Sequence, residues 1–299
     1  MKSTSFSPIN GDRFASRLVA PLYFLINNAV NRRFADGDGL DIRTFRTSDI
    51  PYPSDSLPEQ ASPARVLSHL FWMALPWAEL ERELGPLCML DTGCGSGLYR
   101  ALFERWSGAR IAGYTGIDSH PRPAAWDRIA AAHPGSRFMA VSAEQVASVL
   151  TRDVNLIVSQ SALEHVKGDR TYFESLADFA RAPARPTVQV HLLHAPACLG
   201  LYGLHGFRQY PPGVMRRITG LFEDFSRAYA FALGGARCKE VHRRFIHNRA
   251  GGDRRATETE TYGKCLLDAL RADMESPADD PLFYALVIHS HPHRPVIRG

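Results

Sequence analysis

The chain has 299 residues, of which 45% are hydrophobic and 22% are charged, and its formal net charge is +4 at pH 7. These values are typical of a globular protein with a full core, and they exclude the disordered, collagen-like and disulfide-scaffold classes. The Lys and Arg residues are scattered in short pairs, which gives no indication of a nucleic-acid partner. The five cysteines contain no C-x-x-C pair, so we expect no disulfide and a cytoplasmic location.

The first 85 residues lack the pattern of a secretory signal. The apolar stretch 18–30 contains Pro21 and is too short to span a bilayer, which leaves a helix packed on the protein body or an interfacial helix that touches a membrane. Residues 36–63 are rich in Gly, Pro, Ser and Asp, as in a loop. Residues 63–84 have helical spacing that Pro76 interrupts. Residues 1–85 are therefore predicted to form a helical cap and linker.

From residue 86 onward, short apolar runs alternate with helical patterns, as in an α/β sheet with crossover helices. The predicted strands are 88–90, 111–117, 137–141, 154–159, 187–193, 228–233 and 284–289. The predicted helices between them are 98–106, 124–133, 171–181 and 213–222. This pattern predicts one doubly wound, mostly parallel domain over 86–299, with an insert at about 199–264 on the acceptor side.

A glycine-rich turn follows the first of these strands directly. It reads Asp91-Thr92-Gly93-Cys94-Gly95-Ser96-Gly97, and alternate glycines let a backbone turn tightly and approach a ligand. Leu98 occupies the place of the third glycine of the dinucleotide fingerprint G-x-G-x-x-G, and no G-K-S/T follows. The spacing disfavours a nicotinamide-dependent oxidoreductase, which stays as an alternative, and excludes a P-loop.

An acidic residue followed by G-x-G-x-G resembles the first motif of the class I, seven-strand S-adenosylmethionine-dependent methyltransferases. The resemblance implies a seven-strand sheet with an antiparallel last strand, and S-adenosylmethionine as the cofactor. It implies that the glycine loop lies against the amino-acid part of the cofactor. The residues that it places at the cofactor are Asp91, Gly93, Cys94, Gly95, Gly97, Asp118, Ser142, Ala143, Glu144 and Ser159.

The ends of the next strands support this resemblance. Asp118 ends the second strand, where a carboxylate can accept hydrogen bonds from two ribose hydroxyls or cap the next helix. In the family an Asp at the end of the third strand contacts the adenine amino group, but Ser142 stands here, with Glu144 or the backbone near Ala143 as alternatives. The fourth strand leads to L-E-H-V at 163–166, as in many small-molecule methyltransferases, and lacks the N-P-P-Y-like motif of nucleic-acid amino-methyltransferases.

Methyl transfer is a direct displacement that requires mainly alignment, and a hydroxyl acceptor also needs a base. His165, His194 and His205 are the candidate bases because they follow the fourth and fifth strands. Arg208 and Tyr210 are candidate acceptor contacts in the segment H-G-F-R-Q-Y, which resembles methyltransferases of bacterial glycan synthesis. The alternative is that this segment is a packed crossover whose side chains belong to the core.

The prediction is an enzyme that methylates an oxygen, or less favourably a nitrogen, of a small molecule or glycan-type acceptor. A methyltransferase-fold protein that binds the cofactor without turnover is the alternative. His289, His291 and His293 alternate near the C-terminus, but no carboxylate lies close to them in the sequence, so no metal site is expected.

Overall fold

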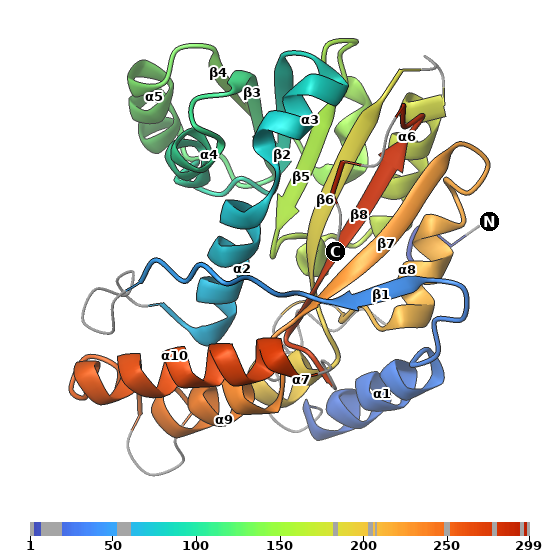
Figure 1. Ribbon diagram of the computed structural model, residues 1–299. Helices are drawn as coiled ribbons and strands as arrows, with labels where there is room; N and C mark the ends of the chain where they lie inside the picture. Colours follow the sequence, from blue (N-terminus) through green and yellow to red (C-terminus); the bar gives the residue numbers. More distant parts are fainter. Residues whose placement is uncertain are drawn as a thin grey trace.

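One eight-stranded sheet forms the centre of the protein, which we describe from a computed structural model (Figure 1). The structure describes residues 3–6, 20–52, 61–181, 185–202, 206, 208–247, 252–276, 280–293 and 296–297. The strands are β1 (Asp41–Thr44), β2 (Leu87–Thr92), β3 (Ile111–Asp118), β4 (Ser136–Ala140), β5 (Leu156–Gln160), β6 (Thr187–His194), β7 (Ser226–Leu233) and β8 (Phe283–Ser290). Their order is β1-β7-β8-β6-β5-β2-β3-β4. The α/β class and all seven predicted strands are confirmed.

The last strand is antiparallel to both of its neighbours. β8 lies between β6 and β7 and pairs antiparallel with each, whereas the other strand pairs are parallel. Because its direction is reversed, β8 begins at the edge of the sheet where the parallel strands end, and Phe283 pairs with His194 there. The predicted antiparallel last strand is confirmed.

The cap differs from the prediction at one element. The helices before the first predicted strand are α1 (Ala20–Arg33), α2 (Pro63–Ala74) and α3 (Trp77–Leu84), and the break between the last two falls at Pro76 as predicted. β1, however, lies within the segment predicted as loop and pairs parallel with β7 as an eighth, edge strand. β1 has only four residues, which is too short for an alternation of apolar and polar residues to indicate a strand. Its pairing with β7 stabilises it instead.

Helices cover both faces of the sheet. The later helices are α4 (Tyr99–Ser107), α5 (Pro123–Ala132), α6 (Asp169–Arg181), α7 (Ala197–Tyr202), α8 (Pro212–Thr219), α9 (Ala236–Phe245) and α10 (Thr259–Glu275), with short 3-10 helices η1 (Ala143–Ser148) and η2 (Leu163–His165). Alternate strand residues serve two cores: Val158 packs in the core with Phe71 and Leu266, whereas Ile157 packs in the core with Phe173. The predicted insert 199–264 is only partly an insert, since it contains β7 of the sheet.

The strand ends and four helices meet at one edge. In Figure 1 the arrow of β5 points toward the end of the sheet where α1, α7, α9 and α10 gather. The carboxyl edge of a parallel sheet is where ligands bind in folds of this type.

No helix among the described residues is long and apolar enough to span a membrane.

Candidate active site

The glycine loop between β2 and α4 is closely packed against the end of β5. Gly93 has φ +76°, and a Cβ atom there would lie 2.3 Å from the Cβ of Ala162. The backbone N–H groups of Gly93 and Cys94 both donate to the carbonyl of Ile117, at 2.8 and 3.0 Å. A side chain at position 93 is therefore excluded by both conformation and space.

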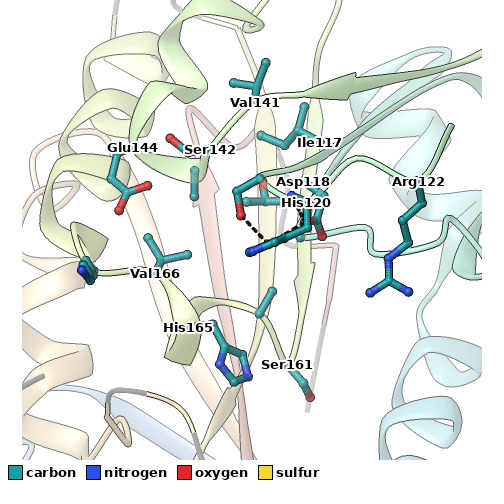
Figure 2. Close-up of a pocket in the computed structure, with 16 residues that line it drawn as sticks. Ile117, Asp118, His120, Arg122, Val141, Ser142, Glu144, Ser161, His165 and Val166 are labelled. Carbon is teal, nitrogen blue, oxygen red and sulfur yellow. Dashed lines mark hydrogen bonds and ion pairs between the residues drawn. The ribbon is translucent and has the colours of Figure 1, made fainter. Parts of the chain in front are cut away.

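Asp118 is held by two backbone amides at the end of β3. Gly95 N–H donates to its Oδ2 at 2.9 Å and His120 N–H donates to its Oδ1 at 2.8 Å. Its side chain is 16% exposed and lines a cavity (Figure 2). Each carboxylate oxygen keeps a second lone pair, so the group can still accept hydrogen bonds from a diol.

This first cavity has a volume of about 490 Å³, in the range of small-molecule sites. It is lined by Thr92, Gly93, Ile117, Asp118, Ser119, His120, Arg122, Val141, Ser142, Ala143, Glu144, Ser161, Ala162, His165, Val166 and Lys167. Figure 2 shows Val141, Ser142 and Glu144 at one side of it and Ser161 and His165 at the other. The three strand ends that the sequence singled out thus meet around one space.

The polar groups at the Val141 side are partly occupied by the protein itself. The Ser142 hydroxyl donates to Gln145 Oε1 at 3.3 Å, which leaves the Ser142 oxygen free to accept a further hydrogen bond. Glu144 Oε1 accepts from Gly168 N–H at 3.0 Å, so Glu144 also fixes the loop after η2.

Several predicted cofactor residues lie behind the cavity wall. Asp91 is buried and accepts a hydrogen bond from Tyr114 Oη at 2.6 Å, and burial raises the pKa of its carboxyl to about 7. Ser159 is fully buried and bonds to His191 Nδ1 at 2.9 Å, so it is a core residue, and Ser161 lines the cavity in its place. Of the glycine loop, only Thr92 and Gly93 form cavity surface, whereas Cys94, Gly95 and Gly97 shape the turn.

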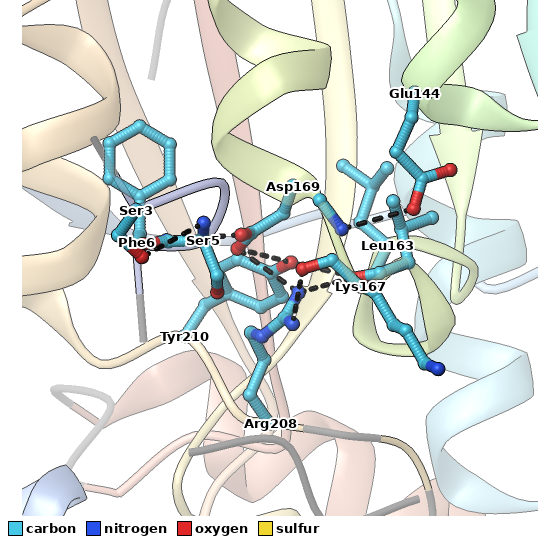
Figure 3. Close-up of polar contacts among 11 residues, drawn as sticks. Ser3, Ser5, Phe6, Glu144, Leu163, Lys167, Asp169, Arg208 and Tyr210 are labelled. Carbon is cyan, nitrogen blue, oxygen red and sulfur yellow. Dashed lines mark hydrogen bonds and ion pairs between the residues drawn. The ribbon is translucent and has the colours of Figure 1, made fainter. Parts of the chain in front are cut away.

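The predicted acceptor contacts Arg208 and Tyr210 prove to be buried supports of the loop after β5. Arg208 is 1% exposed, pairs with Asp169 at 3.2 Å and donates to the carbonyl of Lys167 at 3.0 Å (Figure 3). Tyr210 Oη donates to the carbonyl of Leu163 at 2.9 Å. They line neither cavity, which corrects the prediction; the packed-crossover reading of this segment was right for both residues.

A second cavity of about 400 Å³ adjoins the first at the carboxyl edge. It is lined by Ser62, Ala64, Arg65, Ser68, Tyr99, Gln160, Ser161, His194, Tyr202, His247 and Phe283. Ser161 belongs to the lining of both cavities and has φ +47°, an uncommon conformation for a residue with a side chain. Backbone strain of this kind concentrates at functional sites.

The three histidines predicted as candidate bases lie in different places. His194 ends β6 and lines the second cavity, where its Nε2 lies 3.0 Å from Glu164 Oε1. Glu164 is fully buried, and His194 is its only ion-pair partner among the described residues. His165 lines the first cavity, and His205 lies outside the described residues.

The ring of His194 is also fixed by aromatic neighbours. It stacks on Tyr202 with ring centroids 5.9 Å apart and meets the edge of Phe283 at 4.9 Å. Within the described ranges no group of three potential ligands could hold a metal ion. His289 pairs instead with Glu83 at 3.5 Å, and His291 bonds to the carbonyl of Ala180.

Sequence reasoning missed most of the second cavity. Arg65 and Ser68 come from the cap, and Tyr202 comes from the crossover after β6, so no local motif joins them. Glu164 was visible only as part of the L-E-H-V run. Its burial beside His194 follows from the pairing of β5 with β6, which sequence spacing alone does not give.

The first cavity fits S-adenosylmethionine in its donor set. A carboxylate that can accept from a diol, a close backbone approach at Gly93 and apolar walls at Ile117, Val141 and Val166 suit the adenosine and amino-acid parts of this cofactor. The fit does not rely on an adenine-binding Asp, because Ser142 retains an acceptor oxygen.

Comparison with solved structures finds methyltransferases of low similarity to this chain. The plantazolicin methyltransferase BamL has a TM-score of 0.45 at 14% identity, over 78% of this chain and 87% of that one. The N-methyltransferase NodS from Bradyrhizobium japonicum WM9 has a TM-score of 0.43 at 14% identity, over 72% and 94%. The 1,6-didemethyltoxoflavin-N1-methyltransferase of Burkholderia thailandensis has a TM-score of 0.40 at 13% identity, over 81% and 93%. At these TM-scores the likeness says nothing about the acceptor.

The sequence comparisons are more selective. No curated protein matches the chain in sequence. Residues 90–182 match the family model described as a methyltransferase domain, and this segment carries the glycine loop, Asp118 and the whole lining of the first cavity. The match assigns residues 90–182, which carry the first cavity, to a methyltransferase domain.

Proposed function

We propose that the enzyme methylates a hydroxyl oxygen of a small-molecule or glycan-type acceptor that binds in the second cavity. The observation that carries this proposal is the common wall at Ser161: a cofactor cavity and a second cavity with His194 in its lining meet at one residue. Direct displacement needs donor and acceptor atoms in adjoining spaces, held in line.

The chain would hold the cofactor through groups already in place. Asp118 would accept hydrogen bonds from the ribose hydroxyls, and Ser142 would accept one from the adenine amino group, with Ala143 and Glu144 beside it. Gly93 and the Ser161 side of the cavity would receive the amino-acid part. The cofactor supplies an electrophilic methyl group on a sulfonium sulfur and leaves as a neutral thioether.

His194 is the proposed base. Nε2 of His194 lies 3.0 Å from Glu164 Oε1, and a neutral imidazole that keeps its proton on Nε2 beside this carboxylate has its lone pair on Nδ1. Nδ1 would take the proton of the acceptor hydroxyl as its oxygen receives the methyl group that the cofactor would supply. The Glu164 carboxylate then stabilises the imidazolium and fixes the ring orientation, as the third group of a catalytic triad does.

Two measurements test the proposal in order. Calorimetric titration with S-adenosylhomocysteine tests the cofactor site, and we expect micromolar binding that Asp118→Ala weakens at least about tenfold through lost hydrogen bonds. A screen of sugars and phenols for methyl transfer then tests turnover. Cofactor binding without turnover on any acceptor would favour the non-catalytic alternative.

The base is tested with paired variants once an acceptor is found. His194→Asn should lower kcat by about 10²- to 10⁴-fold and leave the affinity for S-adenosylhomocysteine unchanged. His165→Asn is the matched control, since His165 lines the first cavity. An amine acceptor arrives with its own lone pair, so an undiminished kcat in His194→Asn would indicate N-methylation and overturn the proposed role.

A further inference from the structure

The charge of the second cavity is one-sided. Among the described residues, its lining contains one permanent cation, Arg65, and no carboxylate. Glu164 is fully buried, does not line the cavity, and lies 3.0 Å from Nε2 of His194. A cavity of this composition favours an anionic ligand and disfavours a cationic one.

In the part of the chain that the structure describes, no carboxylate compensates the charge of Arg65. No carboxylate of the described residues lies within ion-pair distance of its guanidinium, and the first turn of α2, where it stands, contains no acidic residue. Its neighbour His69 is neutral at physiological pH, because burial, with smaller contributions from Arg65 and Arg105, lowers the pKa of that imidazole to about 4.

The position of Arg65 is also unfavourable for a purely structural cation. The helix macrodipole destabilises a positive side chain in the first turn. An anion bound there would be stabilised by the macrodipole and by the charge of Arg65. Arg65 is exposed and contributes only its backbone amide to the helix cap, as a donor to Ser62 Oγ. The side chain is thus free to serve a ligand.

Aromatic side chains form part of the remaining lining, beside the polar side chains of Ser62, Ser68 and Gln160. Tyr99, Tyr202 and Phe283 line the cavity together with the ring of His194. Flat side chains of this kind pack on flat ligand bodies and leave a few polar groups to orient them.

From these observations we infer that the acceptor is a flat hydroxy acid, whose carboxylate pairs with Arg65 and whose hydroxyl faces His194. The inference rests on the proposed function, because it assigns the acceptor of that reaction. Arg65 is here a specificity-determining residue, since a guanidinium pairs with a carboxylate through two parallel hydrogen bonds.

Matched pairs of acids and esters test the charge alone. The probes are 4-hydroxybenzoate and 6-hydroxy-2-naphthoate, each beside its uncharged methyl ester, titrated into the enzyme with S-adenosylhomocysteine bound. We expect each acid to bind about tenfold more tightly than its ester, and Arg65→Gln to reduce that ratio to within about twofold. Arg105→Gln is the control, because it removes a nearby exposed charge that does not line the cavity.

Three outcomes would overturn the inference: equal binding of acid and ester, a preference for the acid that persists in Arg65→Gln, or binding of neither. They are separable from failure of the proposed function. If neutral phenols are methylated and acids are not, the proposed function stands and the inference fails. If S-adenosylhomocysteine does not bind, or no acceptor is methylated, the proposed function itself fails.

Discussion

Asp91→Asn should stabilise the protein, and the gain should grow with pH. The carboxyl of Asp91 is buried, and its pKa is raised from 3.8 to about 7, first by burial and then by the nearby charge of Asp118, against the hydrogen bond from Tyr114. The folded protein therefore binds this proton more tightly than the unfolded chain does. The contribution of Asp91 to stability is therefore full below pH 3.8, is lost as pH rises to about 7, and is constant above that.

The size of the effect follows from the two pKa values. A difference of about three pKa units corresponds to about 4 kcal/mol of lost stability at pH 8, of which only about 1.5 kcal/mol is lost by pH 5. Asn is neutral at both pH values, and its Oδ1 can still accept the 2.6 Å hydrogen bond from Tyr114. The variant should therefore gain about 3 kcal/mol more over the natural protein at pH 8 than at pH 5.

Urea unfolding followed by circular dichroism at pH 5, 6, 7 and 8, without cofactor, measures this difference. Tyr114→Phe is the companion variant: it removes the hydrogen bond that lowers the Asp91 pKa, so its stability should fall more steeply with pH than that of the natural protein. A stability gap between Asp91→Asn and the natural protein that stays constant from pH 5 to pH 8 would refute the reasoning.

Two further variants test residues that shape the cofactor cavity or support the loop beside it. Gly93→Ala should lower the free energy of unfolding by about 2–4 kcal/mol, because it combines φ +76° with a Cβ contact of 2.3 Å to Ala162. Gly95→Ala is the control, since its Cβ would meet no atom within 4 Å. Thermal unfolding of the two variants separates the packing contribution from the conformational one. Arg208→Leu should lower the free energy of unfolding by about 3–5 kcal/mol, because it leaves the buried Asp169 without its cation. The double variant with Asp169→Leu should recover part of that loss. Full additivity of the two losses in denaturant unfolding would contradict the pairing.

The sheet could be predicted from the sequence because its signals are local. Each of the seven predicted strands is a short apolar run between helical patterns, and Pro76 marks the helix break by its missing N–H. β1 was missed because a four-residue edge strand derives its order from pairing with β7, a contact across some 190 positions of the chain.

The cofactor site was likewise predictable only at residues with a local sequence signal. Gly93 and Asp118 were predictable, since each stands directly at a strand end. The prediction placed Ser159 at the cofactor. Successive side chains on a strand point to opposite faces, however, and Ser159 faces the core toward His191. The cavity wall begins two residues later, at Ser161, where the strand has ended.

The acceptor side shows why residue chemistry alone misleads. Arg208 and Tyr210 were predicted to contact a ligand because a charged and an aromatic side chain lay in a predicted loop. Both are instead buried and contact Asp169, which is distant in sequence. Arg65 looked like an ordinary helix residue, yet it lines the second cavity because α2 crosses the end of the sheet. In each case the partner decides the role: a cation beside a buried carboxylate supports the fold, and a cation without one is available to a ligand.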